Sequence, residues 1–312
     1  MNPGKSFLLI SCVCFISSFS GFSQIHSIDS HSYHLRNSDK IEWNDFKGTP
    51  RRSLFLSFTA TTNEHEEVLR LSQQDVKQKW TVHLNDTLLG NLQQDENNML
   101  SYFSIAPGIL KNGKNDLHIQ QTDTTADDIQ VGDIAVINRP LHEFINEASI
   151  EVSVVDRHTN TLLPARLTIV DKRNSLQPVA ASFDSLLAVR TGCIYTGSGK
   201  VLFGLPGGTY TLYANRGFQY GVDSLQIVVK RGDKVKRTLT IEKEVPLEGW
   251  ISCDTHIHTL TYSGHGDASM KERIITLAGE GIELPVITEH NRCVDLIIKV
   301  NEPPAVFYSC SR

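Results

Sequence analysis

The chain has 312 residues and a formal net charge of −5, and its 35 acidic and 30 basic side chains are interspersed along the sequence. This pattern leaves no basic stripe and so excludes the usual nucleic-acid-binding surface. Hydrophobic residues make up 40% and aromatic residues 8%, which is typical of globular proteins, and the length allows two or three domains. After the N-terminus no apolar run is long enough to cross a bilayer.

The first residues have the pattern of a secretion signal. Lys5 supplies a positive n-region, Phe7 to Phe19 forms an apolar h-region, and the small residues Gly21 and Ser23 suit a signal peptidase site. A membrane anchor or a buried helix is the alternative, but the apolar run is short for a bilayer span. We therefore predict a signal peptide over residues 1–23 and a secreted or periplasmic bacterial protein.

Residues 24–51 are polar and rich in Ser, His and Asp. Few apolar residues are available there to build a core. The histidines in this stretch are too loosely spaced to frame a metal site. We predict a solvated linker.

Residues 52–139 carry short runs of alternating or β-branched apolar residues, such as SLFLSFTA, KWTVHLN and DIAVIN. Turn signals such as Asn85-Asp86 separate the runs, which is typical of an all-β sandwich or jelly roll. Trp80 and Val82 share one face of a strand by the two-residue periodicity. The stretch WTVHLNDTLLGNL followed by IAPGILKNGKNDLHI resembles the galactose-binding-like jelly rolls that accompany secreted hydrolases. The resemblance implies carbohydrate at the jelly roll as a partner, and a purely structural spacer is the alternative.

Residues 147–245 give a second β pattern, with runs such as SIEVSVVD, ARLTIVD and LQIVVK. The segment GKVLFGLPGGTYTLYANRGFQY resembles carboxypeptidase-regulatory-like sandwiches, in which a Pro-Gly turn leads into a strand. The resemblance implies a second all-β sandwich that packs against a neighbouring domain. The residues of this region indicate no chemistry of their own.

A strand with paired histidines follows. Trp250 to His258 is mostly apolar, and residues two apart in an extended chain project from the same side. Asp254, His256 and His258 therefore face one way. Two imidazoles at this spacing can bind one divalent ion, and Asp254 is placed to orient a ligand histidine. Structural histidines without a metal are the alternative, because a lone His-x-His is weak evidence.

The next residues supply further candidate ligands. The loop after the strand carries His265 and Asp267, and the capping box SMKE predicts the start of a helix. The run LPVIT predicts a short buried strand, directly followed by Glu289 and His290. A β-loop-α-β unit of this kind places polar residues at the carboxyl ends of both strands, where α/β barrels have their active sites.

The run DTHIHT, then SGHGD, the capped helix and ITEHN resemble the start of a PHP (polymerase and histidinol phosphatase) metallohydrolase domain, most closely the CehA/McbA-like secreted branch. The resemblance implies that residues 249–312 form the first βαβ portion of an α/β (TIM-like) barrel. It also implies Zn, Mn or Fe ions that activate water for phosphoester or carbamate/ester hydrolysis of a small-molecule substrate. Glu289 would orient a ligand or act as the general base, and Asp267 is slightly favoured over His265 as a ligand. Carried over by position, the metal ligands are His256, His258, Asp267 or His265, and His290.

The chain departs from that family after His290. Residues 291–312 contain no histidine, and a barrel needs roughly 200 residues or more. We therefore expect a C-terminally truncated, inactive fragment of an exported hydrolase, with Ile274, Leu277 and Ile287 exposed. The alternative is a secreted β-domain module that binds carbohydrate or protein and carries a vestigial hydrolase start.

Overall fold

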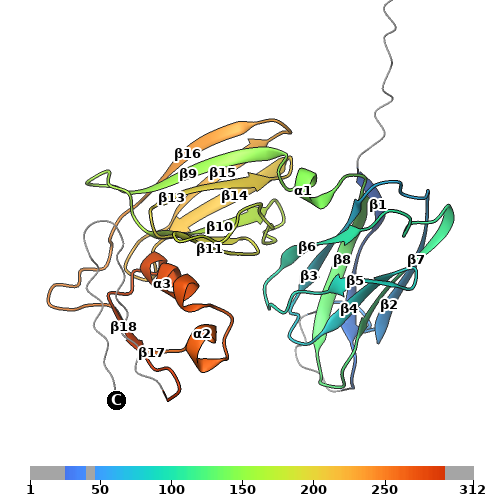
Figure 1. Cartoon of the computed structure of the whole chain (residues 1–312), viewed down its shortest axis with the longest axis horizontal. Coiled ribbons are helices and arrows are strands. Elements are labelled where there is room, and N and C mark those ends of the chain that lie inside the picture. Colours follow the sequence, from blue (N-terminus) through green and yellow to red (C-terminus); the bar gives the residue numbers. More distant parts are fainter. Residues whose placement is uncertain (1–24, 40–45, 292–312) are drawn as a thin grey trace, which may run out of the picture.

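A computed structural model describes residues 25–39 and 46–291. Figure 1 shows two β-sheet domains followed by a small α/β segment next to the second of them. The predicted signal peptide and the last residues of the C-terminal region lie outside the described residues. Within the described part, no helix is both long and apolar enough to cross a membrane.

The first domain is a sandwich of two four-stranded antiparallel sheets. The apolar residue at every second position faces the other sheet, as the period of a strand requires. Trp80 and Val82 are fully buried, which confirms the face predicted for them. One sheet has the order β1 (Ile25–Arg36), β8 (Asp128–Ile137), β3 (Glu67–Gln74), β6 (Met99–Ile105), and the other β2 (Ser53–Ala60), β7 (Gly113–Gln121), β4 (Trp80–Leu84), β5 (Thr87–Asn91).

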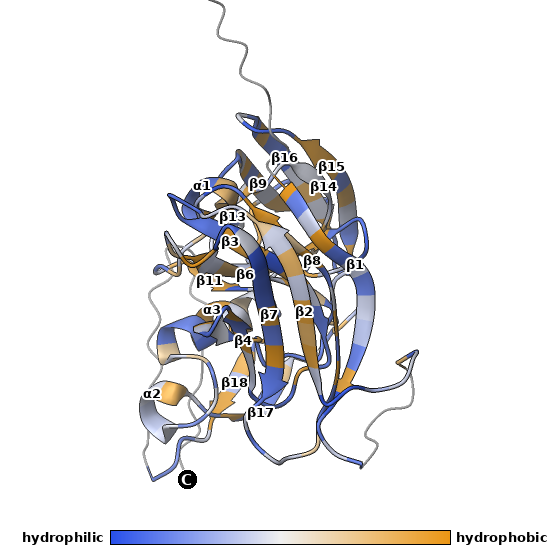
Figure 2. Cartoon of the chain, turned by 90° about the vertical axis from the view of Figure 1, so that its right-hand side faces the viewer, coloured by the Kyte–Doolittle hydropathy of each residue, from blue (hydrophilic) through white to orange (hydrophobic). Residues whose placement is uncertain are grey.

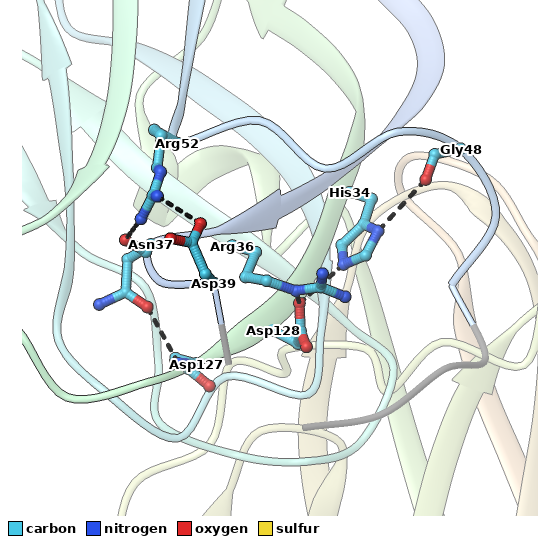
Figure 3. A network of polar contacts seen from close by, with 8 residues as sticks. All are labelled: His34, Arg36, Asn37, Asp39, Gly48, Arg52, Asp127 and Asp128. Carbon is cyan, nitrogen blue, oxygen red and sulfur yellow. Dashed lines mark hydrogen bonds and ion pairs between the residues drawn. The ribbon is translucent and has the colours of Figure 1, made fainter. Parts of the chain in front are cut away.

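The linker predicted over residues 24–51 is wrong in its first half, because residues 25–36 form the edge strand β1, paired with β8. Most of its side chains are polar because an edge strand exposes much of its surface, yet Leu35 lies fully buried in the core. Figure 3 shows the polar contacts around its end: Asp128 lies 2.8 Å from His34 Nε2 and 2.5 Å from Arg36 Nε. These long-range contacts anchor a strand whose local sequence does not predict one.

The second domain is also a sandwich, and the short helix α1 (Leu141–Phe144) precedes it. Its larger sheet is antiparallel, whereas the smaller one pairs β9 with β16 in parallel. The larger sheet has the order β11 (Leu187–Arg190), β12 (Cys193–Thr196), β10 (Ala165–Asp171), β14 (Gly208–Asn215), β15 (Asp223–Val229), and the smaller β13 (Lys200–Leu205), β9 (Ala148–Asp156), β16 (Lys234–Ile241). The prediction that β-sheets make up most of the chain is confirmed.

The C-terminal segment contains the parallel pair β17 (Cys253–Ile257) and β18 (Leu284–Ile287), with α2 (Leu260–Ser263) and α3 (Met270–Gly279) between them. Ser269 caps α3, and its side chain and that of Glu272 make both bonds of the predicted capping box. Two strands are all that the described residues contribute to this sheet, so they show no beginning of a barrel. That part of the predicted fold class is wrong, because the segment packs on the second domain instead of on further strands of its own.

Helix α3 lies against the β11-β12-β10 sheet of the second domain. At Gly279 the approach is so close that an added Cβ would lie 2.6 Å from Tyr195 Cδ1 and 3.1 Å from the Ala165 carbonyl oxygen. Leu277 is only 5% exposed. Ile274 and Ile287 are partly buried. The expectation that these three residues would be exposed is therefore wrong, because the segment packs on the second domain.

Candidate metal centre

Four histidines meet at one edge of the small parallel sheet. His256 lies in β17 and His258 directly after it, while His290 follows β18. The carboxyl ends of parallel strands lie at the same edge, so the two strand ends bring these side chains together. His265 reaches the same place from the loop after α2, which turns back at Gly264 with a φ of 71°.

The imidazole rings contact one another directly. His256 Nε2 lies 2.7 Å from His258 Nε2, and His265 Nε2 lies 2.8 Å from His290 Nε2. The ring of His258 is parallel to that of His290, with centroids 4.7 Å apart and planes inclined by 8°. His258, His265 and His290 each offer one ring nitrogen, and these three atoms lie within 4.8 Å of one another. Three imidazole donors from separate parts of the chain are thus close enough to share one ion.

The surroundings of His258 make its protonation unfavourable. Partial burial lowers the pKa of His258 below its usual 6.5, and the neighbouring imidazoles His256, His290 and His265 lower it further. A neutral imidazole is the form that binds a metal. The arrangement therefore keeps the ligand form of His258 populated to lower pH than an isolated histidine would.

The hydroxyl group of Ser263 positions His258 from behind the cluster. Ser263 Oγ donates to the Glu289 carboxylate and lies 3.4 Å from His258 Nδ1. Because that hydroxyl proton is already donated, the contact is satisfied when Nδ1 carries the imidazole proton. Nε2 of His258, which faces His256 Nε2, is then the nitrogen with a lone pair for a metal. A chain of this kind commonly fixes the tautomer of a metal-ligating histidine.

Glu289 is buried, with 7% of its surface exposed, and it accepts hydrogen bonds from both Thr259 and Ser263. Burial alone would raise the pKa of its carboxyl group, but the bonds from Ser263 and Thr259 lower it below the ordinary value. The structure thus places Glu289 as a support behind the imidazoles. Sequence reasoning missed Thr259 and Ser263; the hydroxyl residues close to the His-x-His were the signal for them.

Two of the candidate carboxylates lie away from the rings. The Asp267 side chain is 81% exposed and lies 3.7 Å from Arg273 Nη2 and 3.9 Å from Arg190 Nε. Asp254 accepts a hydrogen bond from the backbone N–H of His256 and lines a hollow of about 570 Å³ beside the second domain. The structure therefore brings His265 to the cluster and leaves Asp267 outside it.

The donor set fits a borderline transition metal. Imidazole nitrogen suits zinc, copper, nickel and iron, whereas manganese prefers carboxylate and water oxygens. The residues that would bind the ion are His258, His265 and His290, with His256 beside them. Of the three metals suggested by the sequence, zinc or iron matches these nitrogens better than manganese.

No family model matches the chain, and no curated protein matches it. Among solved structures it is similar to the backbone protein of the group B streptococcus pilus 2b, at 12% identity over 71% of this chain and 96% of that chain, with a TM-score of 0.26. It is also similar to the shaft pilin SpaA from Lactobacillus rhamnosus GG, at 10% identity over 58% and 89%, with a TM-score of 0.25. The pilus adhesin RrgA from Streptococcus pneumoniae matches at 13% identity over 59% and 33%, with a TM-score of 0.22. Scores this low carry no argument about what the chain does.

These comparisons overturn the predicted family. No family model matches the chain, so membership of the PHP metallohydrolases has no support. The resemblance depended on short motifs in one small segment, and His-x-His at a strand end is a weak signal. The hydrolase assignment, the ester or phosphoester substrate and the catalytic role of Glu289 depended on that family and are withdrawn with it.

Proposed function

We propose that the protein is an exported β-domain binding module whose C-terminal segment binds one transition-metal ion at the histidine cluster. The observation that carries the metal part is the convergence of His258, His265 and His290 within 4.8 Å from three separate parts of the chain. Two β sandwiches make up most of the described residues, and the N-terminal sequence has the pattern of an export signal.

The proposed ion would act by linking segments. Its ligands come from the end of β17, the loop after α2 and the turn after β18. Binding to the folded segment and not to the unfolded chain stabilises the folded state by mass action. The small sheet has few strands of its own, so we expect the ion to be a main source of its rigidity.

The test is a zinc titration of the full chain after treatment with a chelator, followed by calorimetry. We expect binding of one equivalent, and we expect His258→Ala to weaken it at least about tenfold because one of the three ligands is lost. His158→Ala is the matched control, since that histidine lies 75% exposed in the second domain, far from the cluster in sequence. A wild-type chain that binds neither zinc nor iron, or equal losses in both variants, would overturn the proposal.

A further inference from the structure

The outer face of the β2-β7-β4-β5 sheet lies open to solvent among the described residues. Alternation sends Leu54, Val82 and Leu117 into the core of the first domain and their neighbours outward. Figure 2 looks toward this sheet, and hydrophilic and hydrophobic residues alternate along β2 and β7. The outward side chains therefore form a surface that the domain does not use for its own packing.

A row of rings and apolar groups crosses this face in register. Phe55 on β2 is paired with His118 on β7, which is paired with His83 on β4, and His83 is paired with Leu88 on β5. The rings of Phe55 and His118 are 5.9 Å apart and meet edge to face. Phe55 is 58% exposed and Leu88 is 54% exposed. Large rings held side by side by strand pairing offer a rigid platform at low entropic cost to binding.

Hydrogen-bonding groups border the row on β7. Lys114 Nζ lies 3.1 Å from Asp116 Oδ1, and Ser57 also donates to Asp116. Gln120 lies beyond His118 on the same strand face. Together with the rings, Lys114, Asp116 and Gln120 line a hollow of about 290 Å³. That size is near the lower end of the range for small-ligand sites, about 300–1,000 Å³.

The charges in the lining decide what fits. Lys111 and Lys114 are balanced by Asp86 and Asp116, so the hollow has no excess of either sign. A strongly charged ligand would gain little from such a surface, while a neutral ligand with many hydroxyl groups could use both the donors and the acceptors. A protein partner normally needs about 800 Å² per side with several large apolar anchors. Phe55 and Leu88 are too few for that.

We infer that this hollow, the sheet-face groove, binds a neutral glycan. A sugar ring presents C–H groups on its face, which suit the negative face of the Phe55 ring, and hydroxyl groups at its rim. The rim hydroxyls would meet His118, Gln120 and the Lys114–Asp116 pair. The inference deepens the proposed binding function by naming a ligand class for the first domain, and it is independent of the metal centre.

The experiment uses the full chain in affinity electrophoresis through gels that contain mannan, xylan, galactan or mixed-linkage β-glucan, with polygalacturonate and heparin as charged comparators. We expect retardation by at least one neutral polysaccharide. Phe55→Ala should weaken that binding about tenfold because the stacking surface is lost. Since Phe55 is mostly exposed, the variant should keep its thermal midpoint.

Phe183→Ala is the matched control, because this phenylalanine is 44% exposed but lies in the second domain. It should leave the retardation unchanged. Retardation by the charged polymers alone, by no polysaccharide, or equally in Phe55→Ala and wild type would overturn the inference. Zinc titration of wild type and of Phe55→Ala separates the two proposals. A chain that binds zinc but no neutral glycan contradicts the sheet-face groove and leaves the metal centre unaffected.

Discussion

His34 in the first domain and the histidines of the C-terminal segment have opposite surroundings. In the first domain, His34 is 5% exposed and contacts Asp128, which also accepts from Arg36 (Figure 3). In the C-terminal segment, the rings of His258 and His290 contact other imidazoles and lie near the surface. The contacts of His34 with Asp128 are structural and charge-balanced. The C-terminal histidines instead bring several ring nitrogens close together. A histidine is therefore assigned a role by its partners and not by its presence.

The substitution with the largest expected effect on this comparison is at Asp128. Asp128→Ala removes the acceptor of Arg36 and His34, whose side chains are 13% and 4% exposed, and leaves a buried cation without a partner. Such a loss costs about 3–5 kcal/mol of unfolding free energy. Urea unfolding of the full chain, followed by tryptophan fluorescence, measures it in the transition of the first domain.

Asp39→Ala provides the control for that measurement. Asp39 pairs with Arg52 in the same region of the first domain, but its side chain is 98% exposed. An exposed ion pair contributes less than about 1 kcal/mol because water screens it. Equal losses in the two variants would show that the buried contacts of Asp128 do not anchor β1.

The second prediction concerns how the histidine cluster is supported. Gly279→Ala places a methyl group 2.6 Å from the Tyr195 ring, and the Tyr195 hydroxyl is itself held by Glu280 at 2.8 Å. Alanine would gain about 1 kcal/mol from helix propensity. Overpacking costs about 1–3 kcal/mol, and the backbone oxygen of Ala165 cannot move aside easily, so we expect a net loss.

Limited proteolysis measures the effect of Gly279→Ala. We expect α3 to detach from the second domain, which exposes the C-terminal segment to cleavage. Lys271→Ala, an exposed position on the same helix, should leave the cleavage rate unchanged. If Gly279→Ala is as resistant as wild type, the second domain does not support the cluster.

Much of the fold was predictable because strand alternation is a local signal. The buried face of β4 and the capping box of α3 followed directly from neighbouring residues. Strand β1 was not predictable, because its polar sequence becomes a strand only through the distant β8 and Asp128. The burial of Leu277 was missed for the same reason, since its cover is supplied by another domain.

The site was predictable in part. The spacing of His256 and His258 and the position of His290 after a strand identified residues that the structure brings together. The choice between His265 and Asp267 depended on the path of a glycine-containing loop, which spacing does not determine. The family assignment failed because a short motif records which ligands are present and not the chain around them.

The third prediction tests protonation of the cluster. Protons compete with the ion for imidazole nitrogen, so zinc affinity should fall at least about tenfold between about pH 7.5 and about pH 5.5. Because the pKa of His258 is lowered, first by burial and then by the other imidazoles, the folded segment binds protons less readily than the unfolded chain. The metal-free segment should therefore lose stability as the pH falls below about 6.5 and show little change above it. Zinc calorimetry and thermal melts across this range measure both effects, and a pH-independent affinity would contradict the assignment of imidazole ligands.

The smallest expected effect is at the start of α3. Ser269 accepts a hydrogen bond from the backbone N–H of Glu272, and Glu272 accepts from the backbone N–H of Ser269 in return. Ser269→Ala breaks one of these bonds and should cost about 1 kcal/mol, whereas Ser269→Asp keeps a capping oxygen and should cost much less. The cap lies just after the loop that carries His265, so a looser helix start should weaken zinc binding by about fivefold, the same free energy expressed as affinity. Loss of helix stability with unchanged zinc affinity would show that His265 is held by its contact with His290 and not by the capped helix, which would place the rigidity of the centre at the strand ends.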